Sequence, residues 1–266
     1  MFKNLLFIFS STLTLSACDE FNNKGAAVCF NSDLYKEGNQ QVQATLDGNV
    51  VQRLDITVSE GIIKGNVAVL KRNFYLIENN KLSKRSNIVQ TITTQIDKSN
   101  KQFIRLMTQE VDKDGNKTEV TLTPYYSNSF DFKEGDDSSI TINKQVIKHL
   151  DNKVEAGSEY STKRDFLGMK EITTPLGTFK TCHIRETIEL INTQSEFKYS
   201  QVSDAFFAKN AGLLVKNHRT SRFGVDLAEE MSAVTFLLKA RLGDKQYIAS
   251  SEWLKAHNLK EMIAAD

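Results

Sequence analysis

The sequence has little of what would interrupt a long β-sheet or carry the chain across a membrane as a helix. It contains only two prolines, Pro124 and Pro175, in 266 residues, so few positions oppose strand pairing. Its apolar run at residues 5–15 is shorter than the roughly 20 residues that a transmembrane helix needs. The 34 basic and 33 acidic side chains nearly cancel, which argues against a nucleic-acid partner or a membrane surface bound by charge.

Residues with catalytic or metal-binding chemistry are also few. The four histidines, His149, His183, His218 and His257, show no metal-ligand spacing. The loop at residues 112–116 lacks the glycine and glutamate that an EF-hand places at positions six and twelve, which predicts a hairpin turn. Ser195-x-x-Lys198 matches one motif of penicillin-binding proteins, but residues three apart on a strand face opposite sides. We therefore predict a protein that is not an enzyme and uses no metal or cofactor.

The first residues form an export signal. Lys3 precedes the apolar run, and Leu15-Ser16-Ala17-Cys18 follows it. These four residues resemble the lipobox of bacterial lipoproteins, in which the cysteine is acylated and the signal is cut just before it. The alternative is a plain signal peptide with an incidental cysteine. The resemblance implies a palmitate-type lipid anchor at Cys18 and a mature chain of 249 residues that faces the periplasm.

Asp19 follows the lipidated position. In enterobacterial lipoproteins, an aspartate there resembles a signal for retention in the inner membrane, so the expected location is the cell envelope with the inner membrane favoured.

Lipidation of Cys18 would leave Cys29 and Cys182 as a pair. Two remaining thiols in an exported protein are more often bonded than free, which predicts a disulfide. Two separate buried thiols are the alternative.

Period-two alternation recurs along the chain after Cys29, as in residues 49–58, 87–96, 101–111, 117–123 and 178–190. Short turn-forming pieces separate these runs, which implies antiparallel pairing. We predict a mainly β fold, a large curved antiparallel sheet in the form of a half-barrel, open barrel or sandwich. The basic pair Lys71-Arg72 and the cluster Lys81, Lys84 and Arg85 are expected at solvated hairpin ends.

The predicted organisation has four parts: a signal peptide at 1–17, a lipidated tether at 18–28, an antiparallel β domain at 29–243 and a helical tail at 244–266. A weak helical pattern also occurs near residues 144–150. In the tail, Ser251 is a candidate cap. An apolar stripe at helical spacing predicts a helix that packs on the sheet or binds a partner; it comprises Trp253, Leu254, Ala256, Leu259, Met262 and Ile263.

A further motif lies in the second half. Pro175, Gly177, Thr178 and Phe179 are followed by an aromatic-rich segment and by Gly212-Leu213-Leu214-Val215-Lys216. This resembles a Pro-x-Gly-Thr-Phe hairpin and Gly-Leu-Val-Lys strand of poorly characterised exported proteins, with Leu214 as an extra residue. Such proteins look like antiparallel half-barrels, related in shape to carriers of lipids. As a turn signature, Pro175 presets φ, Gly177 can take positive φ, and Phe179 is expected to fill the core below.

Two functions follow from this sequence. The first is a membrane-anchored binding protein whose sheet encloses a groove for a lipid-like or hydrophobic ligand, with candidate aromatics at Phe74, Tyr75, Phe103, Phe179, Phe206 and Phe207. The alternative is a structural lipoprotein that binds another envelope protein through a sheet edge or the C-terminal helix.

Overall fold

The computed structural model describes residues 25–78, 81–82, 88–112, 114–136, 140–148, 153–190 and 197–264. Cys18, Asp19, Lys84 and Arg85 lie outside these ranges. The predicted β fold is confirmed, because most of the described chain belongs to antiparallel strands. The strands are β1 (Gln40–Asp47), β2 (Val50–Lys64), β3 (Val67–Glu78), β4 (Lys81–Leu82), β5 (Ile88–Asp97), β6 (Gln102–Val111), β7 (Lys117–Thr123), β8 (Tyr126–Ser129), β9 (Ile140–Lys148), β10 (Lys153–Thr174), β11 (Gly177–Leu190), β12 (Lys198–Ala208), β13 (Leu214–Gly224), β14 (Glu229–Leu242) and β15 (Lys245–Ile248).

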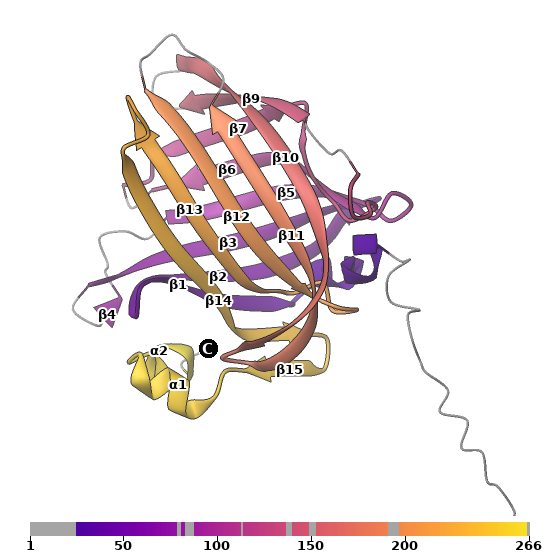
Figure 1. Cartoon of the computed structure of the whole chain (residues 1–266), viewed down its shortest axis with the longest axis vertical. Coiled ribbons are helices and arrows are strands. Elements are labelled where there is room, and N and C mark those ends of the chain that lie inside the picture. The colour runs from indigo at the N-terminus through magenta and orange to yellow at the C-terminus, as the bar shows by residue number, and fades with distance from the viewer. Residues whose placement is uncertain are drawn as a thin grey trace, which may run out of the picture.

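The strands follow one another in the sheet almost in chain order. The path runs from β1 through β3, β5 to β7, and β9 to β15, while β4 pairs with β3 and β8 with β6. β1 also pairs with β14, so the sheet bends back on itself. In Figure 1 the half from β1 to β7 lies behind the half from β10 to β14, and the strands of the two halves cross. The weak helical pattern near residues 144–150 was a wrong prediction, since β9 covers most of it.

The two halves face each other through side chains. Phe130, just after β8, meets Phe207 of β12 with ring centroids 5.0 Å apart, and Tyr126 of β8 donates a hydrogen bond to Glu186 of β11. We call the face of the sheet that carries these side chains the inner face. Directly opposite residues of an antiparallel pair share a face, so the pairing register identifies the inner-face residues of each strand.

The N-terminal segment closes one end of the molecule. The 3₁₀ helices η1 (Gly25–Cys29) and η2 (Ser32–Tyr35) precede β1. The predicted tether therefore ends earlier than residue 28. Ala26 has no exposed surface, and its amide donates to the Phe132 carbonyl oxygen over 3.0 Å. We call this end the base. We call the opposite end the mouth; it is where β3 and β13 end and where β5 and β14 begin.

The disulfide between Cys29 and Cys182 joins η1 to β11 at the base, with 6.2 Å between the two Cα atoms. Both residues are fully buried. They belong to a core cluster that also holds Ala26, Ala68, Ile96, Phe103, Phe130, Phe132, Phe166 and Ile184.

The tail is not the single helix that its apolar stripe predicts. Residues 245–248 form β15, and two short helices follow, α1 (Ser251–Ala256) and α2 (Lys260–Ala264). Asn258, at φ +57°, separates them, because asparagine tolerates the left-handed conformation that ends a helix. Ser250, one residue before the expected cap, accepts the Trp253 amide over 3.2 Å. No helix in the described part of the chain is long and apolar enough to cross a membrane.

The tail packs on the outer side of the sheet, below β1 and β14 in Figure 1. Leu254, Leu259 and Ile263 are buried there against Val42, Leu54 and Leu238 and their neighbours. This burial confirms the packing role of the stripe, with the break at Asn258 keeping its apolar residues on the sheet.

Candidate functional site

The inner face carries a layer of charged side chains between the base and the mouth. We call it the arginine layer and define it as Arg53, Arg72, Arg105, Arg164 and Arg219 with Asp55 and Glu186. Arg72 stands opposite Thr57, whose hydroxyl accepts from Arg72 Nε over 3.1 Å. Position 72 was therefore predicted wrongly as a solvated hairpin end. Lys71, its neighbour, points to the other face and pairs with Glu60.

Asp55 is the carboxylate of the back half. Arg53 binds it with Nε 2.7 Å from Oδ1 and an NH2 group 2.9 Å from Oδ2. Removal from solvent raises the pKa of Asp55, and attraction by Arg53, Arg72 and Arg219 only partly offsets this. Arg219 belongs to β13, so the attraction joins groups from the two halves.

Glu186 is the carboxylate of the front half. Arg164 Nε lies 3.8 Å from its Oε1, and an Arg164 NH1 group donates to the Ser129 carbonyl over 3.0 Å. Tyr126 donates to Glu186, while the guanidinium of Arg105 lies 5.6 Å from the centre of the Tyr126 ring. Burial and the Glu186 charge raise the pKa of Tyr126, so this hydroxyl remains a donor.

Arginine outnumbers acid in the layer. Five guanidinium groups face two carboxylates, a difference of three positive charges. Three further acids on this face lie nearer the mouth and reduce the difference: Glu110, which accepts from the Gln90 amide, and Glu78 and Glu229, which share the strand faces of Leu76 and Met231. Desolvation is the main cause that lowers the pKa of Arg72, and the charges of Arg105 and Arg53 add to it. The cations are therefore crowded together.

Aromatic rings line the base side of this layer. Arg164 lies 6.0 Å from the Phe130 ring centre and 5.8 Å from that of Phe132. The ring of Tyr35 in η2 lies 4.8 Å from that of Phe103 at a tilt of 44°, and burial raises the pKa of Tyr35 to about 12. These contacts fill the base with side chains.

Apolar residues on the inner face become exposed toward the mouth. Leu76 is opposite Arg53, Ile88 is opposite Phe74, and Met231 is opposite Ser221. Their exposed fractions are 42%, 37% and 51%. An apolar rim above a cationic layer is the chemistry that suits an amphipathic molecule.

The predicted aromatics are divided among several places. Phe74 is on the inner face, with the Arg53 guanidinium 5.1 Å from its ring centre, and Phe103 and Phe207 belong to the base. Tyr75 packs beside the C-terminal helices. Phe206 is buried on the other face, stacked on His183 at 4.4 Å.

The turn motif forms the β10–β11 hairpin. Pro175 and Leu176 are its two loop residues, since Thr174 pairs with Gly177, and Gly177 has φ +116°. Phe179 is only partly buried at the edge of a cluster around Leu213 and Leu237, so it does not fill the core as expected.

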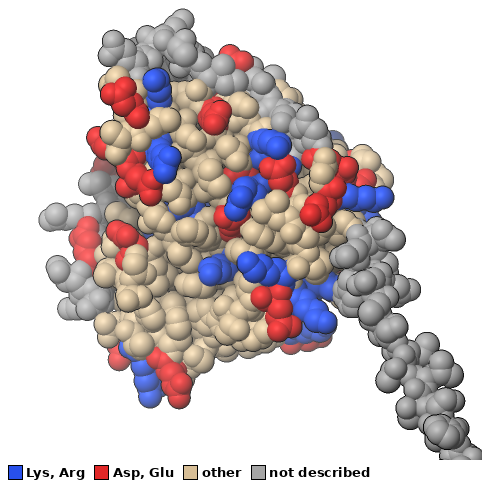
Figure 2. Space-filling view, in the orientation of Figure 1, with Lys and Arg blue, Asp and Glu red and all other residues tan. Residues whose placement is uncertain are grey.

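This hairpin and the C-terminal segment enclose a hollow of about 520 Å³, the hairpin groove. In Figure 2 the lower part of the molecule shows a broad area without charged side chains, bordered at the lower left edge by a small group of acidic and basic residues. The groove is lined by Thr173, Thr174, Pro175, Leu176, Gly177, Phe236, Ile248, Ser250 and Trp253, none of which is charged.

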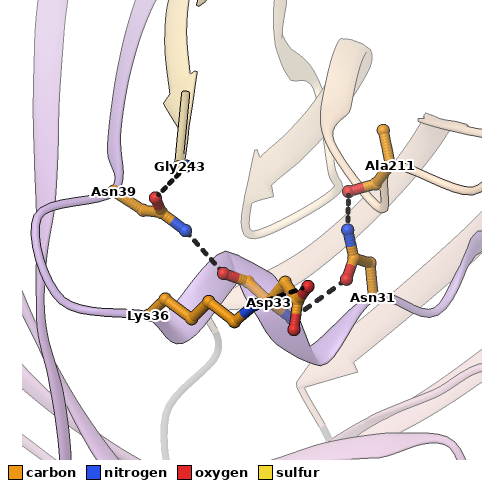
Figure 3. Close-up of polar contacts among 6 residues, drawn as sticks. All are labelled: Asn31, Asp33, Lys36, Asn39, Ala211 and Gly243. Atoms are coloured by element: carbon orange, nitrogen blue, oxygen red, sulfur yellow. Dashed lines mark hydrogen bonds and ion pairs between the residues drawn. The ribbon is translucent and has the colours of Figure 1, made fainter. Parts of the chain in front are cut away.

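A polar hollow of about 580 Å³ lies at the base beside η2. Figure 3 shows that its side chains tie η2 to two turns. Asn31 Nδ2 donates to the Ala211 carbonyl over 3.0 Å, and the Gly243 amide donates to Asn39 Oδ1 over 2.8 Å. Lys36 pairs with Asp33 at 2.9 Å. These contacts hold the N-terminal segment against the two turns, which is a structural role.

In the described ranges, no three His, Cys, Asp or Glu side chains converge to hold a metal ion. Cys18 and Asp19 lie outside those ranges, so the lipidation site stays a prediction from the sequence.

No protein-family model and no curated protein matches the chain. Among solved structures, a protein named a lipoprotein from Parabacteroides distasonis ATCC 8503 has 12% identity and a TM-score of 0.47, covering 78% of this chain and 96% of its own. An exported protein with a YmcC-like fold from Bacteroides fragilis NCTC 9343 has 11% identity and a TM-score of 0.47, covering 77% and 96%. The lipoprotein YmcC of Escherichia coli K12 has 11% identity and a TM-score of 0.36, covering 77% and 88%. These likenesses assign neither a family nor a ligand to the chain.

Proposed function

We propose that this protein is a lipid-anchored envelope lipoprotein, not an enzyme, that binds a lipid-like or hydrophobic ligand on the inner face of its sheet. The observation that carries the proposal is the exposure of Leu76, Ile88 and Met231 on that face at the mouth. These apolar side chains face inward but remain in contact with water. A ligand that covers them forms a stable complex, because removal of apolar surface from water is favourable.

The anchor part of the proposal rests on the lipobox resemblance at Cys18. Six residues, 19–24, separate Cys18 from the first described residue, and a fully extended chain over these seven residue steps reaches about 23 Å at ~3.3 Å each. The folded domain would therefore stand close to the membrane. Asp19 favours the inner membrane within this proposal.

Binding of N-phenyl-1-naphthylamine, an uncharged probe that fluoresces in apolar surroundings, tests the ligand site in the purified lipoprotein. We expect saturable binding that Met231→Lys weakens several-fold, because the lysine places a charge on the apolar rim. Val202→Lys is the matched control, since Val202 is 37% exposed on the opposite face of β12.

Equal binding by the wild-type protein and Met231→Lys would refute the mouth as the site. An absence of probe binding would leave the alternative function, attachment of another envelope protein, for which the hairpin groove is the candidate surface.

A further inference from the structure

The charge of the inner face narrows the ligand class beyond a hydrophobic molecule. Resting on the function proposed above, we propose that the ligand is an anionic amphiphile whose carboxylate or phosphate head group binds the arginine layer while its apolar chain lies toward the mouth. An anionic head group would compensate the positive charge that the described side chains of the layer carry in excess, which a wholly apolar ligand would not.

The first step of the argument is electrostatic. Groups removed from water are stable as ions only when opposite charges or hydrogen bonds compensate them. Among the described side chains, the layer holds five guanidinium groups against two carboxylates. An anion between the two halves would restore the balance.

The second step concerns geometry. The cations come from both halves: Arg53 and Arg72 from the back, Arg164 and Arg219 from the front. The Arg219 charge lowers the pKa of Asp55, so these two groups from different halves lie near enough to interact. Guanidinium groups arranged around one space suit carboxylate and phosphate oxygens, which accept two parallel hydrogen bonds from one arginine.

The third step concerns access. The Arg53 side chain is 34% exposed, and Arg72, Arg105 and Arg219 are partly exposed as well. Solvent therefore reaches the layer, in contrast to the fully buried cluster around the disulfide. The arginine layer lies deeper than the apolar side chains at the mouth. The head group of the ligand would therefore bind deep between the halves, and its chain would point toward the mouth.

Displacement of N-phenyl-1-naphthylamine by three twelve-carbon compounds tests this inference: dodecanoate, dodecyl phosphate and uncharged dodecanol. We expect one or both anions to displace the probe at a concentration about tenfold or more below that of dodecanol, because each charge-assisted hydrogen bond contributes strongly. The two anions separate a carboxylate from a phosphate preference.

Arg219→Gln should remove most of the preference for the anions over dodecanol, whereas Arg219→Lys should keep part of it. The matched control is Arg222→Gln on the same strand, because Arg222 points outward and pairs with Glu230 at 2.8 Å. This control should behave like the wild-type protein.

Equal displacement by anions and dodecanol in the wild-type protein would overturn the inference while probe binding still supported the proposed function. An unchanged anion preference in Arg219→Gln would also overturn it. If that variant fails to fold, the wild-type comparison decides alone, together with its expected weakening at high salt.

Discussion

Asp204 lies on the outer face of the sheet, where it binds an arginine and a histidine. It accepts hydrogen bonds from Arg185 Nε over 2.9 Å and from an Arg185 NH2 group over 3.1 Å, and His183 Nε2 lies 2.8 Å from its Oδ1. Partial burial works to raise its pKa, but the hydrogen bonds from Arg185 and His183 outweigh burial, so the pKa is lowered. The folded state thus favours the ionised form.

We expect Asp204→Asn to lower the free energy of unfolding at pH 7 by about 1 kcal/mol or less, as for other partly exposed ion pairs. Because the pKa is depressed in the folded protein, this contribution is present above the ordinary value of about 4 and is lost as the pH falls through the folded-state value. Urea denaturation at pH 7 and at low pH, with exposed Asp226→Asn as control, measures it. A difference that persists at low pH would contradict this cause.

The C-terminal helices are the element that shields one side of the sheet. Each is too short to be stable alone, so packing of their apolar residues holds them in place. Leu259, between the two helices, has no exposed surface, and its amide donates to the Leu254 carbonyl over 2.9 Å. The tail therefore depends on this one side chain as much as on its own hydrogen bonds.

Leu259→Ala should lower the free energy of unfolding by about 2–5 kcal/mol, because it removes a fully buried side chain and leaves a cavity. Lys255→Ala, on the exposed side of α1, should change it by less than about 0.5 kcal/mol. Equilibrium urea denaturation measures both. A small effect of Leu259→Ala would mean that the tail is detached from the sheet in solution.

At the scale of the whole molecule, the disulfide links the N-terminal segment to a strand 153 residues later. In the chain-entropy model, a bond across so long a loop stabilises the folded state by about 4–5 kcal/mol. We expect Cys29→Ala with Cys182→Ala to lose stability of that order, as measured by urea denaturation of the oxidised wild-type protein and the double variant. A difference under about 1 kcal/mol would contradict the model.

Most of the fold could be predicted from the sequence because alternation and turns are local signals. The Cys29–Cys182 pair could also be predicted, since few cysteines leave few pairings. The arginine layer could not, because each arginine stands alone on its own strand, and alternation cannot tell a polar inner face from a solvated outer one. Arg72 and Lys71 are neighbours in sequence and lie on opposite faces.

The pairing of β1 with both β2 and β14 sets an order on biosynthesis. β1 is among the first segments made, and its partner β14 is among the last. Until residue 241 has emerged, one edge of β1 stays open, and an open strand edge is where chains pair with the wrong neighbour. The pairing of β1 with β14 therefore cannot form until residue 241 has been made, and the open edge of β1 must be kept from mispairing until then.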